Sequence, residues 1–362
     1  MRTARGMKVL AAVGAATLAL GLTACGGGDN GGENGGGSDK PTLKIGLAYD
    51  IGGRGDKSFN DSAAAGLDRL KVDLADKFDL EVNELPATVN ETEDDKYARL
   101  VALCQGGYDP VIAVGFVYAG ADPANGPLAR AAKECPDTKF AIIDSAAVDL
   151  PNVAGLTFAE HEGSFLVGAA AALKSETGHI GFIGGCLIGL IQKFEAGFVA
   201  GAQYINPDIR VDTQYISTPA EACSGFNDPA RGKTAAEGMY DAGADVVYHA
   251  AGGSGTGVFQ AASEKGGKAI GVDSDQYQTV DEALRDVIIT SMLKRVDNAV
   301  YNFVIEFSEG KFTSGEQVFD LKSEGVGYAT TGGFIDDITD QLDELKEKIV
   351  SGEITVPDAP QS

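Results

Sequence analysis

Residues 48–67, AYDIGGRGDKSFNDSAAAGL, combine groups that could hold a small polar ring. An apolar run ends on Asp50, a glycine-rich turn follows, and an expected helix begins at Phe59 and Asn60. A carboxylate and an amide can hydrogen-bond the edge of a ring while a phenyl group stacks on its face. Because these side chains are poor choices for a plain turn, the stretch predicts a binding site.

Other candidate positions follow apolar runs further along the chain. Asp144 and Asp273 each close such a run, and loops begin at Gly184 and Gly252 after two more. If these runs are parallel strands, their carboxyl ends border the crevice in which ligands of such sheets bind. We therefore expect these positions to gather with Asp50 around one cavity.

Plainer interpretations of the same residues remain open. Asp50 and Asp144 could cap helices, a common use of carboxylates at strand ends. Phe59 could be a core residue in the first turn of its helix. The run GGSGTG (252–257) lacks the lysine and hydroxyl residue of a phosphate-binding loop and is expected to form a tight turn.

The elements that must position these residues alternate regularly from Pro41 onward. Short apolar runs and amphipathic stretches take turns, which predicts parallel strands with helices on both faces of each sheet. Residues 152–158 are expected to cross between lobes, and 287–310 to supply a strand and a long helix that returns to the first lobe. The expected strands are 43–49, 110–116, 139–145, 179–185, 209–216, 245–251 and 268–274, and the expected helices are 59–76, 92–106, 160–175, 190–205, 229–242 and 336–350.

Capping signatures mark the starts of three of these helices. Ser58 with Asp61, and Thr92 with Asp95, have the spacing of a capping box. Asp228 precedes a proline, which is favoured at the first position of a helix.

A chain of 362 residues exceeds one ordinary core, so two lobes are expected. We predict an N-terminal lobe of residues 41–156 and 293–316 and a C-terminal lobe of 157–292 and 317–358. Chain crossings near 157, 292 and 317 would form a hinge between two doubly wound α/β lobes.

Composition excludes some partners. The formal net charge is -24, from 53 acidic and 29 basic residues. Nucleic acids and anionic membrane surfaces attract basic patches, so neither is expected to bind. The histidines and cysteines lack metal-ligand spacing, and no metal or cofactor is expected.

The N-terminus predicts export. Residues 1–24 have a basic start, an apolar stretch from Val9 to Leu22 and small residues before Cys25, as in a signal peptide. The end LTAC resembles the lipobox of bacterial lipoproteins, in which Cys25 would be diacylated; an ordinary cleaved signal is the alternative. Residues 25–40 are glycine-rich and are expected to tether the protein, through the lipid only, at the extracytoplasmic face of the cell membrane.

Four further cysteines would then lie in an oxidising compartment. Cys104 and Cys135 fall at the same ends of neighbouring expected helices, whereas Cys186 and Cys223 both follow strands of the second lobe. This order favours the pairs 104–135 and 186–223, although sequence alone does not determine the connectivity.

Several segments, which span nearly the whole expected mature chain, carry a resemblance to one family. They are GGRGDKSFNDSAAAGL (52–67), FAIIDS (140–145), FEAGFVAG (194–201), GFNDPARGK (225–233), HAAGGSGTGVFQAA (249–262), GVDSDQY (271–277) and TSMLKRVDNAVY (290–301). Together they resemble the basic membrane protein family of substrate-binding lipoproteins, whose best understood branch binds purine nucleosides for ABC transporters. The resemblance implies the type I periplasmic-binding-protein fold.

The resemblance also implies how the ligand is held. Phe59 and Phe226 would stack on the two faces of a nucleobase. Asp50, Asn60 and Asp144 would face the base or its sugar from the first lobe. The other site residues would close on the ribose and the neighbouring edge: Gly253, Asp273 and Lys294. Several carboxylates suit a neutral solute with many donors and repel phosphates. The alternative for Lys294 is a surface pair with Arg295.

The expected function is therefore binding, not catalysis. A monomer would close around a purine nucleoside (guanosine, inosine or adenosine) and deliver it to the permease and ATPase subunits of an ABC transporter. One alternative is a sensory receptor for another polar solute, such as a sugar. Another is an exported nucleoside hydrolase, which the lack of metal-spaced histidines and of a nucleophile elbow disfavours.

Overall fold

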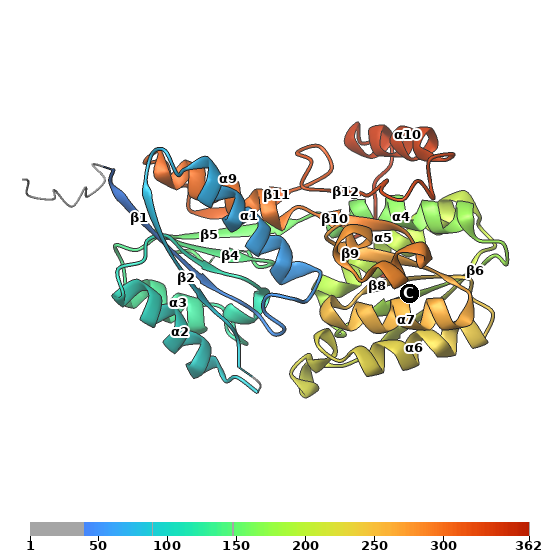
Figure 1. Ribbon diagram of the computed structural model, residues 1–362, viewed down its shortest axis with the longest axis horizontal. Helices are drawn as coiled ribbons and strands as arrows, with labels where there is room; N and C mark the ends of the chain where they lie inside the picture. The colour runs from blue at the N-terminus through green and yellow to red at the C-terminus, as the bar shows by residue number, and fades with distance from the viewer. Residues whose placement is uncertain (1–39, 89, 147, 362) are drawn as a thin grey trace, which may run out of the picture. The chain divides into compact units, whose positions relative to one another are not determined.

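The computed structural model describes residues 40–361 except residues 89 and 147 (Figure 1). These residues build two six-stranded sheets whose strands are parallel, apart from one antiparallel edge strand. Each sheet has helices on both faces, as the alternating sequence pattern predicts. The predicted α/β class with two doubly wound lobes is confirmed.

The N-terminal lobe contains the sheet β11-β5-β4-β3-β1-β2. Helices α1 and α9 cover one face of this sheet, and α2 and α3 cover the other (Figure 1). The elements are β1 (Thr42–Ala48), α1 (Phe59–Asp73), β2 (Asp79–Leu85), α2 (Glu93–Gln105), β3 (Val111–Ala113), η1 (Phe116–Tyr118), α3 (Pro127–Glu134), β4 (Phe140–Ile143), β5 (Val153–Phe158), α9 (Val296–Ser308) and β11 (Gly315–Phe319).

The C-terminal lobe repeats this strand order in the sheet β12-β10-β9-β8-β6-β7. Helices α4 and α5 pack on one face of it and α6 and α7 on the other. The elements are α4 (Glu160–Lys174), β6 (His179–Gly184), α5 (Gly189–Ile205), β7 (Arg210–Tyr215), η2 (Pro219–Glu221), η3 (Ser224–Phe226), α6 (Pro229–Asp241), β8 (Val246–Ala250), η4 (Gly252–Ser254), α7 (Gly255–Lys265), β9 (Lys268–Asp273), α8 (Gln276–Thr279), η5 (Glu282–Val287), β10 (Ile288–Lys294), β12 (Val326–Tyr328) and α10 (Thr339–Val350).

Alternation along β1 shows how the core is built. Ile45 and Leu47 point to the face covered by α1, where they join Leu67 in one buried cluster. Ala48, at the end of the strand, packs on the opposite side with Leu103 of α2. Because both faces are covered, the strand reads as a nearly continuous apolar run.

The chain passes between the sheets after β5, β10 and β11. These strands end at Phe158, Lys294 and Phe319, one or two residues beyond the crossings expected at 157, 292 and 317. The expected crossing segment 152–158 is itself a full strand of the first sheet. The exact division into lobes stays a prediction.

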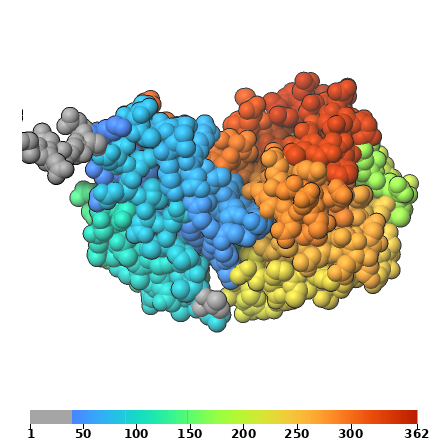
Figure 2. Space-filling model, in the orientation of Figure 1, coloured from blue at the N-terminus to red at the C-terminus, as the bar shows by residue number. Residues whose placement is uncertain are grey.

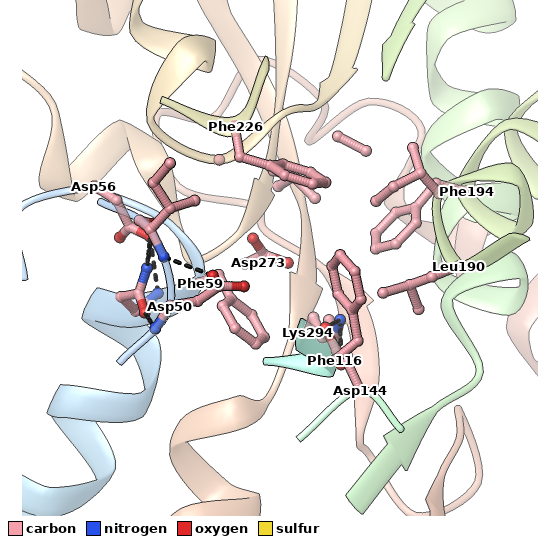
Figure 3. A pocket seen from close by; sticks show the side chains of 16 residues that line it. Asp50, Asp56, Phe59, Phe116, Asp144, Leu190, Phe194, Phe226, Asp273 and Lys294 are labelled. Atoms are coloured by element: carbon pink, nitrogen blue, oxygen red, sulfur yellow. Dashed lines mark hydrogen bonds and ion pairs between the residues drawn. The ribbon is translucent and has the colours of Figure 1, made fainter. Parts of the chain in front are cut away.

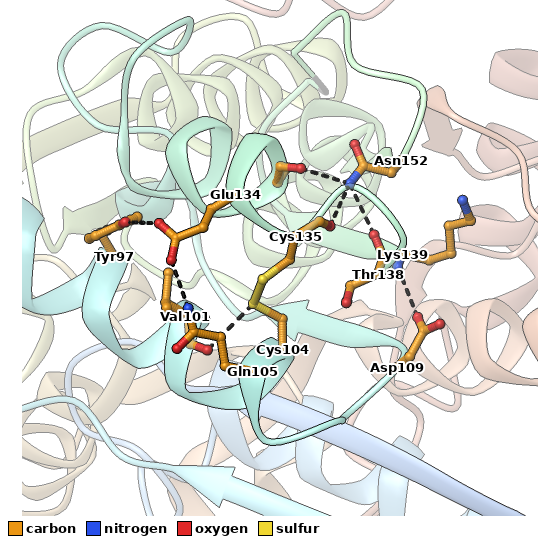
Figure 4. The surroundings of a disulfide bond; sticks show 11 residues. Tyr97, Val101, Cys104, Gln105, Asp109, Glu134, Cys135, Thr138, Lys139 and Asn152 are labelled. Atoms are coloured by element: carbon orange, nitrogen blue, oxygen red, sulfur yellow. Dashed lines mark hydrogen bonds between the residues drawn. A yellow bond between two sulfur atoms is a disulfide. The ribbon is translucent and has the colours of Figure 1, made fainter.

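Two disulfides join the cysteines in the predicted pairs, Cys104–Cys135 and Cys186–Cys223. The first links the C-terminal ends of α2 and α3 within the N-terminal lobe (Figure 4). Beside it, Asn152 Nδ2 donates to the carbonyl oxygens of Ala132, Cys135 and Thr138 at 3.0–3.2 Å.

The signal peptide, the tether and Cys25 fall in 1–40, of which only Lys40 is described, so their predictions lie outside the described residues.

Candidate functional site

A cavity that is partly open to solvent lies at the carboxyl ends of the strands, lined by side chains from both lobes (Figure 3). Gly253 does not line it, although its neighbour Gly252 does. The other predicted site residues all line the cavity: Asp50, Phe59, Asn60, Asp144, Phe226, Asp273 and Lys294.

Four phenylalanines surround this cavity. Phe59 opens α1, and Phe226 ends the short turn η3 of the other lobe. Phe116, from η1, meets the ring of Phe226 edge to face, with the ring centroids 6.4 Å apart. Phe194 of α5 completes an apolar wall beside Leu190. Sequence reasoning missed Phe116 and Phe194. Phe116 ends the expected strand 110–116, and Phe194 lies in the first turns of the expected helix 190–205.

The N-terminus of α1 is capped by Asp56, and the expected cap by Ser58 is wrong. Asp56 accepts hydrogen bonds from the backbone N–H groups of Ser58, Asn60 and Asp61 at 2.9–3.1 Å. The glycine-rich turn places the carboxylate of Asp56 below the first turn of the helix. There it accepts from the free N–H groups in place of the Ser58 hydroxyl. By contrast, Thr92 and Asp95 form the predicted capping box of α2.

Ser58 instead connects the two lobes. Its hydroxyl donates to Asp273 Oδ2 at 2.5 Å, at the end of β9. Its carbonyl oxygen accepts from the hydroxyl of Ser274 at 3.0 Å, and the carbonyl of Lys57 accepts from Gln276 Nε2 at 2.9 Å. In Figure 2 the blue segment that contains the start of α1 accordingly lies against orange segments of the C-terminal lobe. Phe59 is thus fixed at the junction of the lobes.

Asn60 holds the turn that presents Asp50. Its side chain accepts from Asp50 N at 3.2 Å and donates to Ile51 O at 3.2 Å and to Asp56 Oδ2 at 2.9 Å. One carboxylate oxygen of Asp50 accepts from Ile51 N at 2.6 Å. The other has no hydrogen bond among the described residues. Asp50 therefore offers a free acceptor beside the cavity, whereas Asn60 is largely committed to the turn.

Burial changes the protonation of these carboxyl groups. It raises the pKa of Asp50 to about 7, against the opposing effects of the Ile51 N–H and of Lys96 and Arg99. Burial also raises the pKa of Asp56 to about 6, although several hydrogen bonds favour its ionised form. Raised carboxyl pKa values in a cavity are typical of functional sites.

Asp50 makes the stability of the ligand-free protein depend on pH. Its pKa is raised from 3.8 to about 7, so the folded state holds a proton that the unfolded state releases. This contribution is complete below the unfolded pKa and is lost as the pH rises through about 7. We expect Asp50→Asn to be more stable than the original chain at about pH 8 and to lose this advantage at about pH 5.

Urea unfolding at several pH values measures this effect. Asp149→Asn, at an exposed carboxylate of the same lobe, is the matched control and should follow the original chain throughout. If Asp50→Asn and the original chain differ by the same amount at every pH, Asp50 is not the titrating group.

Lys294 lies at the floor of the cavity in a buried ion-pair cluster, not on the surface. Its ammonium nitrogen is 2.6 Å from Asp144 and 3.3 Å from Glu160, and its side chain is 2% exposed. Burial by itself lowers the pKa of Lys294, but the carboxylates of Asp144, Glu160 and Asp273 raise it above its ordinary value. Burial raises the pKa of Asp144 to about 6, against the effect of Lys294.

Glu160 is the member of this cluster that sequence reasoning missed. It opens α4 directly after the chain crosses between the sheets, and its side chain is 1% exposed. Neither carboxylate oxygen has a hydrogen-bond partner among the described residues, so its charge is balanced only by Lys294 and, at 3.5 Å, by Lys193. An acidic residue in a first helical turn is common, so no signal in the sequence marks it.

Asp144 and Asp273 occupy matching places in the two sheets, at the ends of β4 and β9. Both have left-handed backbone conformations, with φ of 66° and 64°. Such conformations are uncommon for residues other than glycine. Asp144 binds Lys294, Asp273 accepts from Ser58, and neither accepts from the N-terminus of a helix. For Asp144, and likewise for Asp50, the alternative of helix capping is therefore wrong.

The described residues include no group of three or more histidine, cysteine, aspartate or glutamate side chains that could hold a metal ion. His249 is fully buried beside Phe259, and burial lowers its pKa to about 3, so it is neutral. Within the part of the chain that the structure describes, no helix is long and apolar enough to cross a membrane.

Comparisons with known proteins agree with this architecture. Residues 43–360 match the family model described as Bmp, ABC transporter substrate-binding protein PnrA-like. The chain is 34% identical over 368 residues to the ABC transporter nucleoside-binding protein BmpA of Lactococcus lactis, covering 96% of this chain and 97% of that one. It is 33% identical over 354 residues to a CD4+ T-cell-stimulating antigen of Listeria innocua, covering 94% and 95%.

A solved structure gives the same result. The solute-binding protein of an ABC transporter system from Aeropyrum pernix K1 is 30% identical and superimposes with a TM-score of 0.73, covering 88% of this chain and 94% of that chain. The family model and the relatives each span most of the chain, including both lobes and the cavity between them. The chain therefore belongs to the Bmp family of PnrA-like ABC transporter substrate-binding proteins.

Proposed function

We propose that this ABC transporter substrate-binding protein captures a purine nucleoside, such as guanosine, inosine or adenosine, in the cavity between its lobes. One observation carries the proposal: Phe59 and Phe226, from opposite lobes, line the same cavity as Asp50, Asp144 and Asp273. Two flat apolar faces and several acceptors match a heterocycle that bears N–H and hydroxyl donors. The name of the Lactococcus relative supports the same class of solute.

Charge fits this class. Carboxylates from both lobes would accept hydrogen bonds from the base and the ribose, and they would repel the phosphates of nucleotides. Lys294 does not offset this, because its charge is already shared between Asp144 and Glu160.

The individual contacts are proposals. The free oxygen of Asp50 is the best placed acceptor for a base N–H, with Asn60 and Asp144 beside it. Asp273 and Lys294 would bind the ribose, and a contact with Gly253 would require the glycine turn to move, since Gly253 itself does not line the cavity.

In the cell, closure of the lobes around the ligand would favour the form that the permease recognises. Substrate-binding proteins of ABC transporters work with permease and ATPase subunits, and we propose that this one does so as a monomer. Acylation of Cys25, after removal of residues 1–24, would hold it at the extracytoplasmic face of the membrane through the tether 25–40.

A thermal-shift panel tests the proposal. Purine nucleosides are expected to raise the melting temperature of the protein by mass action, more than free bases or pyrimidine nucleosides do, and nucleotides are expected to have no effect. Pentoses and hexoses form the comparison set. A shift with sugars alone would favour the sensory sugar receptor, and release of free base during incubation would favour a hydrolase.

A further inference from the structure

We infer that the disulfide Cys186–Cys223 is a positioning element that holds Phe226 ready for the ligand before the ligand arrives. The inference rests on the proposed function, because it concerns the ring that would stack on the base. It assigns a role in binding to residues that do not line the cavity.

The disulfide joins the segment that carries Phe226 to the segment on which the ring of Phe226 packs. Cys223 begins the turn η3, and its carbonyl oxygen accepts from the N–H of Phe226 at 3.3 Å. Cys186 directly follows Gly185, against which the ring packs: a Cβ atom on Gly185 would lie 2.4 Å from Cδ1 of Phe226. The bond therefore ties the segment that carries Phe226 to the surface on which its ring rests. Both cysteines are buried.

Polar contacts hold the backbone of this turn on both sides of Cys223. Ser217 Oγ donates to Gly185 O at 2.6 Å and accepts from Gly225 N at 2.9 Å. Ser254 Oγ donates to Gly225 O at 2.7 Å. The segment just before η3 is exposed at Ala220, Glu221 and Ala222. It is held by the capping box of Thr218 and Glu221, and the N–H groups of Ala222 and Cys223 donate to the carbonyl oxygens of Pro219 and Thr218 at 3.0 and 3.3 Å.

This segment also has an unfavourable backbone conformation. Ala222 and Cys223 are both left-handed, with φ of 52° and 51°. Residues with a Cβ atom rarely adopt this conformation, and two in succession need an external constraint. The hydrogen bonds before η3 supply part of that constraint, and the disulfide adds a covalent link to Cys186. Without the disulfide, the turn depends on hydrogen bonds of exposed residues, so it can release the ring of Phe226 from Gly185.

If the ring of Phe226 is mobile in the free protein, ordering it on binding lowers the affinity for the ligand. We therefore expect Cys186→Ser/Cys223→Ser to weaken nucleoside binding about three- to ten-fold. Calorimetry with inosine or guanosine, at a temperature at which every variant is folded, measures the change. The matched control is Cys104→Ser/Cys135→Ser, which removes the disulfide far from the cavity and should leave the affinity unchanged.

A double-mutant cycle separates positioning from general destabilisation. In a Phe226→Leu background the ring is absent, so loss of the Cys186–Cys223 bond should have little further effect on affinity. If the loss is equally large with and without Phe226, the disulfide does not act through this ring and the inference is wrong.

If the variant Cys186→Ser/Cys223→Ser folds poorly, chemical reduction provides a second test. Cys104→Ser/Cys135→Ser protein is reduced and alkylated, so that 186–223 is the only disulfide opened, and is compared with its oxidised form. Weaker binding after reduction supports the inference, and equal binding overturns it. If the untreated protein binds no nucleoside, the proposed function fails instead.

Discussion

Replacement of Lys294 by methionine is expected to lower the free energy of unfolding by about 3–5 kcal/mol and to abolish ligand binding. Methionine fills a similar volume but leaves Asp144 and Glu160 buried without their shared cation. A buried carboxylate without a partner lowers the free energy of unfolding by far more than an exposed ion pair raises it. The same change removes a cation that lies 5.2 Å from the ring centre of Phe59 in the cavity wall.

The pH dependence of this variant follows from the same cluster. The pKa of Asp144 is about 6 beside Lys294, and removal of the cation must raise it further. A carboxyl whose folded pKa is raised destabilises the folded state increasingly as the pH rises. The loss of stability in Lys294→Met should therefore be larger at about pH 8 than at about pH 5.

Two further variants make the result specific. Lys193→Met removes the other cation near Glu160, but Lys193 is 33% exposed and 3.5 Å away, so a loss of less than about 1 kcal/mol is expected. Adding Asp144→Asn and Glu160→Gln to Lys294→Met should recover much of the stability without restoring binding. Urea unfolding measures all three. Equal stability of Lys294→Met and the original chain would show that the cluster carries little net charge interaction.

Most of the central strands could be predicted from the sequence because burial on both faces makes them continuous apolar runs, but β5 was expected to be a crossing segment. Strands β2, β11 and β12, all at sheet edges, were not predicted, although the fourth edge strand, β7, was expected at 209–216. In β2, DLEVNEL, charged residues alternate with apolar ones and every side chain is at least partly exposed. Its apolar content is too low to stand out, and only pairing with β1 identifies it.

The site was partly predictable for a related reason. A strand-end rule finds Asp50, Asp144 and Asp273, because parallel sheets bring their carboxyl ends together. It says nothing about Glu160, which reaches the cluster only through the path of the chain between the sheets. It also does not distinguish Ser58 from Asp56 as the cap of α1, since that choice depends on how the glycine-rich turn folds.

Repetition of one strand order in both lobes gives the cavity its near symmetry. β4 and β9 hold the same place in their sheets, and each ends in a left-handed aspartate beside the cavity. The two aspartates differ in the side chains that they bind: Asp144 pairs with Lys294, whereas Asp273 accepts from Ser58. Asp273 therefore joins its lobe to α1, while Asp144 neutralises the lysine from the other lobe.

Replacement of Phe59 or Phe226 by leucine is expected to weaken purine nucleoside binding about 5- to 150-fold in each case, from the loss of about 1–3 kcal/mol of stacking. Leucine keeps much of the apolar volume of each ring but has no flat face for a base. Since both residues are only partly buried, stability should change little. Calorimetry with inosine or guanosine gives the affinities, and unfolding in urea gives the stabilities.

Phe116→Leu shows which ring of the N-terminal lobe faces the base. Phe116 touches Phe226 edge to face, so it can support that ring without stacking on the ligand. If Phe59 and Phe226 form the sandwich, Phe116→Leu should cost less affinity than either of the other changes. A larger loss for Phe116→Leu than for Phe59→Leu would move the stacking face to η1. Unchanged affinity in Phe59→Leu and Phe226→Leu, with lower stability, would make both rings core residues and leave the nucleoside without its aromatic support.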